Sequence, residues 1–223
     1  QHLKSTGRLD AWTWKPGEPN EPHIFWDSDV AKWIEAAAYS LALHPDSQLE
    51  KRIDAYIDAA AAAQGPDGYL NSHFIRVEPD KRFTNLRDWH ELYCAGHLIE
   101  AAVAYYQGTG KRVLLDVMCR YADYIATVFG PGPEQKHGYP GHEQIELALV
   151  KLYRVTGEAR YLDLARYFID ERGRLVGVLS DRDVLRAIRE RDAYANLLLP
   201  KLLKGRFCWA GGGMYPYGRR YYF

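Results

Sequence analysis

Apolar residues recur along most of this chain at the three- and four-residue spacing of helices that bury one face. The pattern predicts six helices that follow one another in pairs, at about 30–41 and 47–64, 85–106 and 114–125, and 142–155 and 158–171. Within the pairs, the helix-ending signals are His44-Pro45, Gly108-Thr109-Gly110 and Thr156-Gly157. The chain therefore predicts three helical hairpins.

Shorter signals predict how the chain connects these helices. Residues 1–28 contain several Pro and Trp and are predicted to form a loop, and residues 69–77 are predicted to be extended or irregular. Ser47 and Glu50 have the spacing of a capping box at the start of the second helix. The sequence Gly65-Pro66-Asp67-Gly68 predicts a tight turn.

The predicted hairpins repeat one internal plan. Glu35-Ala-Ala-Ala aligns with Glu100-Ala-Ala-Val at the same shift that places Tyr56 on Tyr121. A second shift places Thr109-Gly110 on Thr156-Gly157 and also Tyr106 on Tyr153. Repeated hairpins hide their apolar faces against their neighbours. This favours an all-α, incomplete α/α toroid of about three hairpins, because a closed ring needs more hairpins; a solenoid is the competing architecture.

The pattern of apolar and polar residues changes after about residue 173, so we expect a domain at 1–173 and an unassigned tail at 174–223. Residues 174–179 are strand-like, and Ser180 with Asp183 predicts a capped helix to about residue 191. This short α/β-like stretch resembles the strand–helix unit of CBS domains, but only over about fifteen residues, so we interpret it as a local coincidence. The Gly- and aromatic-rich residues 207–218 lack the pattern of a phosphate-binding loop.

Composition narrows the possible partners. The formal net charge is +0, which provides no general attraction to nucleic acid or to acidic membranes. No apolar run reaches the length of about twenty residues that a membrane span needs. The three cysteines are widely spaced, which favours a reducing, cytoplasmic location over a disulfide framework. The 17 Tyr and 6 Trp suit flat ligands such as sugar rings.

One helix carries three ligand-type side chains on one face. His90, Cys94 and His97 lie at i, i+4 and i+7, with Glu91 beside them. This spacing is compatible with a metal site, a polar pocket or a satisfied core. The arrangement is not the His-Glu-x-x-His signature of zinc proteases, because Cys94 stands at the fourth step. We therefore predict no metal here, and favour His90 as a pocket residue with Cys94 and His97 in packing roles.

The starts of the other two inner helices also carry polar and aromatic residues. His142 and Glu143 are predicted to begin the fifth helix, and Trp26, Asp27 and Asp29 lie at the start of the first. The carboxylates could serve only as helix caps or dipole partners. Because the repeat makes the first, third and fifth helices equivalent, however, we expect these ends to converge on one rim. Carboxylates and a tryptophan around a concave rim suit sugar recognition.

Five segments follow one another over about residues 7–173: FWDSDVAKWIEAA, GPDGYLN, FTNLRDWHELYCAGHLIEAAVAYY, GYPGHEQIELALVKLYRVTGE and YLDLARYFIDERG. Together, and in this order, they resemble glycoside hydrolase family 127, which includes bacterial β-L-arabinofuranosidases. The resemblance implies an (α/α)6-barrel with a sugar pocket in its mouth. It also implies that His90 and His142 contact the substrate, and that Asp27 and Asp29 help to shape the pocket.

The resemblance also implies what this chain lacks. Similar family members use a zinc-bound cysteine as nucleophile and a glutamate as acid/base, in a segment further along the barrel. Cys208 is the only late cysteine and has no second cysteine beside it. We therefore expect the N-terminal half of the barrel, with zinc only in full-length relatives and no catalytic residue assigned within this chain.

Two functions follow from these expectations. The first is a glycoside hydrolase that acts on terminal arabinofuranosyl residues of plant-type glycans and is truncated here. The alternative is a non-catalytic helical-repeat protein that binds a carbohydrate or a protein partner. Since half a barrel would expose apolar faces, we also expect self-association.

Overall fold

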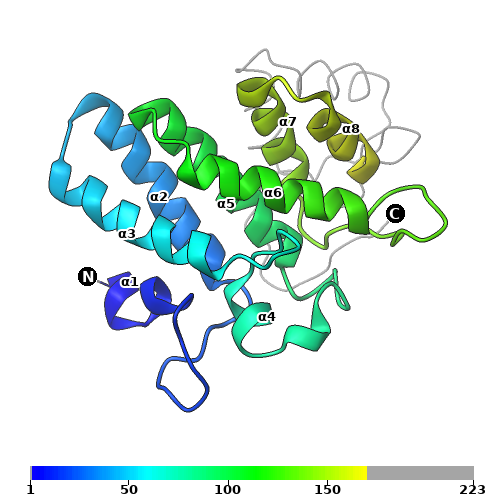
Figure 1. Ribbon diagram of the computed structural model, residues 1–223, viewed down its shortest axis with the longest axis horizontal. Helices are drawn as coiled ribbons and strands as arrows, with labels where there is room; N and C mark the ends of the chain where they lie inside the picture. Colours follow the sequence, from blue (N-terminus) through cyan, green and yellow to red (C-terminus); the bar gives the residue numbers. More distant parts are fainter. Residues whose placement is uncertain (1, 170–223) are drawn as a thin grey trace, which may run out of the picture.

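The computed structural model describes residues 2–169 and consists of helices joined by turns and loops (Figure 1). The helices are α1 (His2–Ser5), η1 (Arg8–Asp10), α2 (Trp26–Leu43), α3 (Ser47–Ala63), α4 (Ser72–Arg76), η2 (Pro79–Lys81), α5 (Glu91–Thr109), α6 (Val113–Val128), α7 (Ile145–Thr156) and α8 (Ala159–Phe168). An isolated bridge joins Phe129 and Lys136. The tail predicted at 174–223 lies outside the described residues.

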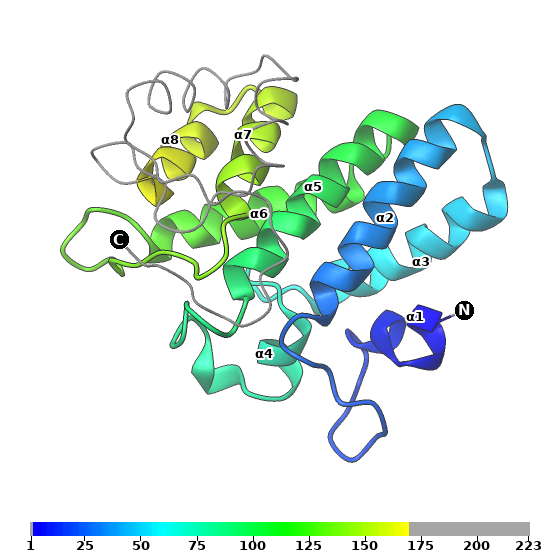
Figure 2. The ribbon, with the colours of Figure 1, turned by 180° about the vertical axis from the view of Figure 1, so that it is seen from behind.

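The six long helices form three hairpins in two rows. The hairpins are α2/α3, α5/α6 and α7/α8. Helix α5 packs between α2 and α7 and forms the middle of the inner row, while α3 packs against α6 in the outer row (Figures 1 and 2). The predicted all-α, partial (α/α)6 toroid of about three hairpins is thereby confirmed.

The repeated turn signals have the same structure in two hairpins. Helices α5 and α7 end at Gly110 and Gly157, which both have φ 76° and both donate a backbone N–H to a tyrosine carbonyl four residues back. Those tyrosines are Tyr106 and Tyr153, the pair that the sequence repeat aligns. Glycine accepts this left-handed conformation without the steric penalty of a side chain.

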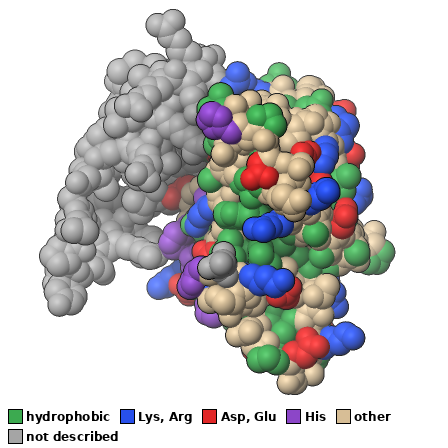
Figure 3. Space-filling view, turned by 90° about the vertical axis from the view of Figure 1, so that its left-hand side faces the viewer, with side chains coloured by type: hydrophobic (Ala, Val, Ile, Leu, Met, Phe, Trp, Pro, Cys, Tyr) green, Lys and Arg blue, Asp and Glu red, His purple; other side chains and the backbone are tan. Residues whose placement is uncertain are grey.

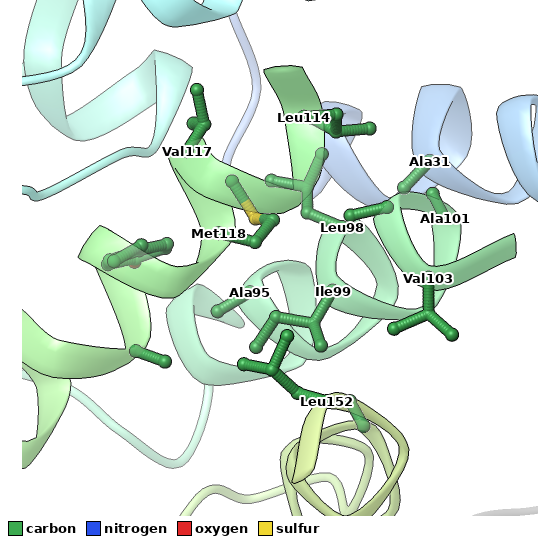
Figure 4. Close-up of a cluster of buried hydrophobic side chains, with 14 of the residues drawn as sticks. Ala31, Ala95, Leu98, Ile99, Ala101, Val103, Leu114, Val117, Met118 and Leu152 are labelled. Atoms are coloured by element: carbon green, nitrogen blue, oxygen red, sulfur yellow. The ribbon is translucent and has the colours of Figure 1, made fainter. Parts of the chain in front are cut away.

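The core is centred on α5, which is buried on most of its sides. Leu98 and Ile99 of α5 are fully buried among side chains from α2, α6 and α7 (Figure 4). The helix predicted at 85–106 is therefore not amphipathic, although the polar side chains on one face indicated an amphipathic helix. Neighbouring helices cover it on three sides. Small residues on α5, including Ala95 and Ala101, allow these neighbours to approach closely.

Gly96 is the clearest example of such a close approach. A Cβ atom there would lie 2.8 Å from the backbone carbon of Gln144 and 2.9 Å from the backbone nitrogen of Ile145, at the start of α7. We expect Gly96→Ala to lower the free energy of unfolding by about 1–3 kcal/mol, because α7 must move away. This loss exceeds the gain of up to about 1 kcal/mol in helix propensity. Chemical denaturation measures the difference, and unchanged or increased stability would refute the close contact.

Three helix starts differ from the sequence prediction. Helix α5 begins at Glu91 rather than near residue 85, and α7 begins at Ile145 rather than at His142. His142 and Glu143 therefore lie in the loop before α7. In contrast, α2 begins already at Trp26, so Asp27 and Asp29 lie in its first turn and do not cap it.

Other local predictions were also wrong or incomplete. Residues 1–28 are not all loop, since they include α1, η1 and the start of α2, and residues 69–77 include α4, which Asn71 caps. The cap of α3 is Asp46, whose carboxylate accepts hydrogen bonds from the backbone N–H groups of Gln48 and Leu49; the predicted capping box is therefore wrong. The predicted turn at Gly65–Gly68 is present, with a hydrogen bond of 2.9 Å from Gly68 N to Gly65 O.

None of the helices between residues 2 and 169 combines the length and the apolar character that crossing a bilayer requires. The cytoplasmic location and the boundary at residue 173 stay predictions.

Candidate functional site

His90 and His142 meet at one end of the inner helices. Their ring centroids lie 4.6 Å apart, although the residues come from loops before α5 and α7 respectively. His90 is the N-cap residue of α5 and has a left-handed backbone, with φ 58°. Its Nδ1 lies 2.6 Å from the carbonyl oxygen of Asp88, which fixes the direction of the ring. Histidine side chains gather on one flank of the described surface (Figure 3).

Aromatic side chains surround the two histidines. The ring centroid of Phe25, at the N-cap of α2, lies 6.1 Å from that of His90. The Tyr93 ring lies 5.5 Å from His90 and 5.8 Å from His142, centroid to centroid. Lys32 of α2 donates a hydrogen bond of 2.8 Å to the Tyr93 hydroxyl. The loops and helix ends of the inner row thus converge, as the repeat predicts.

Sequence reasoning missed Phe25 and Tyr93. Tyr93 follows His90 by three residues, which places both near one face of α5, so the helical spacing held a usable signal. Phe25 immediately precedes the start of α2, where site residues were predicted. Only the fold shows that the Phe25 ring approaches His90. His97 is partly buried, and its ring lies 4.5 Å from Tyr93, so it borders the same cluster.

Asp27 lies in the first turn of α2, and its predicted role in shaping the pocket stays a prediction. Its carboxylate is buried, and Oδ2 accepts a hydrogen bond of 2.8 Å from the backbone N–H of Ser72. Oδ1 has no hydrogen-bond partner among the described residues. Burial raises the pKa of Asp27 to about 6, and the hydrogen bonds from Ser72 act in the opposite direction. Asp27 therefore fastens α4 to the start of α2.

Asp29 and Trp26 are linked by an arginine of the N-terminal segment. Arg8 Nε lies 2.8 Å from Asp29 Oδ2, and the guanidinium carbon lies 4.9 Å from the centroid of the Trp26 ring. Both predicted site residues are partly buried. The structure thus brings them together with Arg8, and their predicted role in shaping the pocket stays a prediction.

Glu143 lies half-buried in the loop that carries His142. The next residue, Gln144, donates its side-chain N–H to Glu100 of α5, and Lys151 of α7 donates a hydrogen bond of 2.7 Å to the same carboxylate. This buried ion pair joins α5 to α7 below the two histidines. It therefore helps to fix the loop from which His142 projects.

The spacing of His90, Cys94 and His97 is compatible with a metal site, and the described residues do not form one. Among residues 2–169, no three His, Cys, Asp or Glu side chains are grouped so that they could hold a metal ion. Cys94 is buried and points to the carbonyl oxygen of Ile24, at 3.5 Å from Sγ. Burial raises the pKa of the Cys94 thiol well above its ordinary value, which disfavours the thiolate that binds zinc.

Comparison with known proteins decides the family. A family model described as the β-L-arabinofuranosidase, GH127 catalytic domain, matches residues 4–197. The chain belongs to glycoside hydrolase family 127. The predicted family is thus confirmed, and the GH127 match covers every described residue that lines the histidine cluster.

Three relatives show how similar this chain is to other GH127 proteins. It is 49% identical over 154 residues to the non-reducing end β-L-arabinofuranosidase of Bifidobacterium longum subsp. longum, covering 67% of this chain and 23% of that protein. The crystal structure of Ara127N-Se, a GH127 β-L-arabinofuranosidase from Geobacillus stearothermophilus T6, has a TM-score of 0.70 and 56% identity, over 74% of this chain and 26% of that one.

A third relative, the GH127 β-arabinofuranosidase BT3674, has a TM-score of 0.70 and 42% identity, over 77% of this chain and 29% of that one. This chain therefore spans about a quarter of the length of the GH127 proteins that it matches. The activity of those whole proteins enters below as a proposal.

Proposed function

We propose that this GH127 chain belongs to a glycoside hydrolase that acts on terminal arabinofuranosyl residues, and that its hairpins supply part of the sugar-binding mouth. The observation that carries the proposal is the meeting of His90 and His142 at 4.6 Å, beside the rings of Phe25 and Tyr93. Imidazole nitrogens can donate to and accept from sugar hydroxyls. Aromatic rings provide the flat apolar surface that a sugar ring needs.

The described residues suit binding more than bond cleavage. Hydrolysis with retention needs a proton donor and a nucleophile at opposite sides of the glycosidic bond. Asp27 and Glu91 are buried acids at the starts of α2 and α5, but each accepts a hydrogen bond from a backbone N–H, at Ser72 and at Phe83. Both acids are therefore committed to structure, and we assign to the rim the tasks of binding and orienting the sugar.

Two assays on the purified 223-residue chain test this function. Isothermal titration with methyl β-L-arabinofuranoside should show binding, and a methyl xyloside, which is its isomer, should bind at least about tenfold more weakly. Release of nitrophenol from a nitrophenyl β-L-arabinofuranoside, with and without added zinc, measures hydrolysis by the chain itself. Absence of arabinofuranoside binding would overturn the assignment of the rim.

Single substitutions of the two histidines provide a sharper test. His90→Ala and His142→Ala are each expected to weaken arabinofuranoside binding about tenfold, the effect of losing one or two hydrogen bonds to the sugar. His44→Ala is the matched control, because His44 is exposed at the C-cap of α2, at the other end of that helix. Equal affinities for all three variants in calorimetry would argue against sugar contact by the histidines.

A further inference from the structure

Glu91 is a buried carboxylate directly next to His90 in the chain. Its side chain is 3% exposed. Oε1 accepts a hydrogen bond of 2.5 Å from the Tyr69 hydroxyl, and Oε2 accepts one of 2.6 Å from the backbone N–H of Phe83. Both donors come from segments that precede α5, so Glu91 ties the start of α5 to the chain before it.

The Phe83 contact closes a segment that is strained at both ends. Phe83 and His90 have positive φ angles, 53° and 58°, which side-chain-bearing residues rarely adopt. Such conformations persist only where the surroundings enforce them, and they are frequent at functional sites. Glu91 bonds the first residue of the segment 83–90 and adjoins the last one. It can therefore hold both unusual conformations in place.

The same segment also holds the loop that carries His142. The backbone N–H of Gly141 donates a hydrogen bond of 3.0 Å to the carbonyl oxygen of Leu86. Lys136 Nζ donates one of 3.1 Å to the carbonyl oxygen of Phe83. The two loops lie so close that a Cβ on Gly141 would collide with the Arg87 carbonyl. Displacement of segment 83–90 would thus move His142 as well as His90.

We infer that Glu91 is a positioning residue that holds segment 83–90, and through it the His142 loop, so that the two imidazoles face one sugar together. The inference rests on the proposed function for its sugar, but the placement of the two rings can be measured without any ligand. The Tyr69 ring adds support, because it packs edge-on against Phe83 with centroids 5.5 Å apart. Glu91 therefore acts on the loop through two partners that contact each other.

Variants at Glu91 separate positioning from general stability. Glu91→Leu removes both hydrogen bonds, whereas Glu91→Gln can keep both, with its carbonyl facing Phe83 N–H and its amide donating to the Tyr69 oxygen. Asp54→Leu is the matched control. Asp54 of α3 is partly exposed, accepts hydrogen bonds of 2.7 Å from the Tyr105 hydroxyl and 2.6 Å from Lys111 Nζ, and is not part of either histidine loop.

The readouts are the nuclear Overhauser effect between the ring protons of His90 and His142, and calorimetry with methyl β-L-arabinofuranoside. The resonances are assigned with His90→Ala and His142→Ala. We expect the cross-peak in the wild type, in Glu91→Gln and in Asp54→Leu. Glu91→Leu should lose it and should bind the sugar at least about tenfold more weakly, while still melting cooperatively.

Two results would overturn the inference: a cross-peak and affinity unchanged in Glu91→Leu, or an equal loss in Asp54→Leu. If Glu91→Leu does not fold, Lys136→Met provides the second test, because it removes an exposed side chain that bonds Phe83 O. A weakened cross-peak in this variant supports the inference, and an unchanged one opposes it. If the wild type shows the cross-peak but binds no sugar, the proposed function fails while the positioning role of Glu91 stands.

Discussion

Leu98→Ala should lower the free energy of unfolding by about 2–5 kcal/mol, because it leaves a cavity in the middle of α5. Leu98 is fully buried and lies in the cluster that joins α5 to its neighbours (Figure 4). Helix α5 contacts α2, α6 and α7, so the cavity would weaken all three hairpins at once. Single domains are stable by about 5–15 kcal/mol, so this loss is a large share of the total.

Leu43→Ala is the matched control for this experiment. Leu43 is 76% exposed at the last residue of α2, and its truncation should change the stability by no more than about 0.5 kcal/mol. Urea denaturation of both variants measures the two differences. Similar values for the two leucines would contradict the central place of α5 in the core.

The alternation of helices and turns could be predicted because its signals are local. Apolar spacing marks a helix, and Gly110 and Gly157 end two helices through a conformation that glycine adopts easily. The repeat revealed that these two turns are equivalent. It also revealed that α2, α5 and α7 are equivalent, which was enough to predict that their ends meet.

The starts of α5 and α7 could not be predicted, because contacts between distant residues decide them. Nothing in residues 85–90 forbids a helix. The segment is held out of α5 by the bond from Phe83 to Glu91 and by the bond from Gly141 to Leu86. The sequence therefore predicted that His90 and His142 share a rim, but not that each projects from a loop.

The spacing of residues after Asp27 already predicts that its side chain is buried. Asp27 precedes Val30 by three residues and Ile34 by seven, and both of these are fully buried. On a helix these positions share one face, so the register alone places Asp27 on the apolar side. Its acidic character favoured the rim, whereas the register predicts the buried position that the structure shows.

Asp27 and Glu91 together should make the protein less stable as the pH rises from about 4 to about 7. Burial raises the pKa of Asp27 from 3.8 to about 6 and that of Glu91 from 4.5 to about 7. The unfolded chain, with ordinary pKa values, loses these protons at lower pH than the folded chain does. Over this range the folded state binds more protons, so rising pH favours unfolding, by an amount on the order of 3 kcal/mol for each group.

Two other groups act in the opposite direction. Burial lowers the pKa of His23, and the hydrogen bond from Lys81 lowers the pKa of Glu78. Their contributions to stability are lost as the pH falls. The total pH profile therefore mixes both signs, and differences between the wild type and neutral variants are needed to isolate the two buried acids.

Asp27→Asn and Glu91→Gln provide these differences, because each keeps the shape of the side chain but removes its titration. Urea denaturation at several pH values between about 4 and 8 gives the stability of each protein. Relative to Glu91→Gln, the wild type should lose stability as the pH rises to about 7 and then level off; relative to Asp27→Asn, it should level off near pH 6. A difference that stays constant with pH would show that these carboxyl groups titrate normally, and that the start of α2 and the start of α5 are more open to water than their contacts indicate.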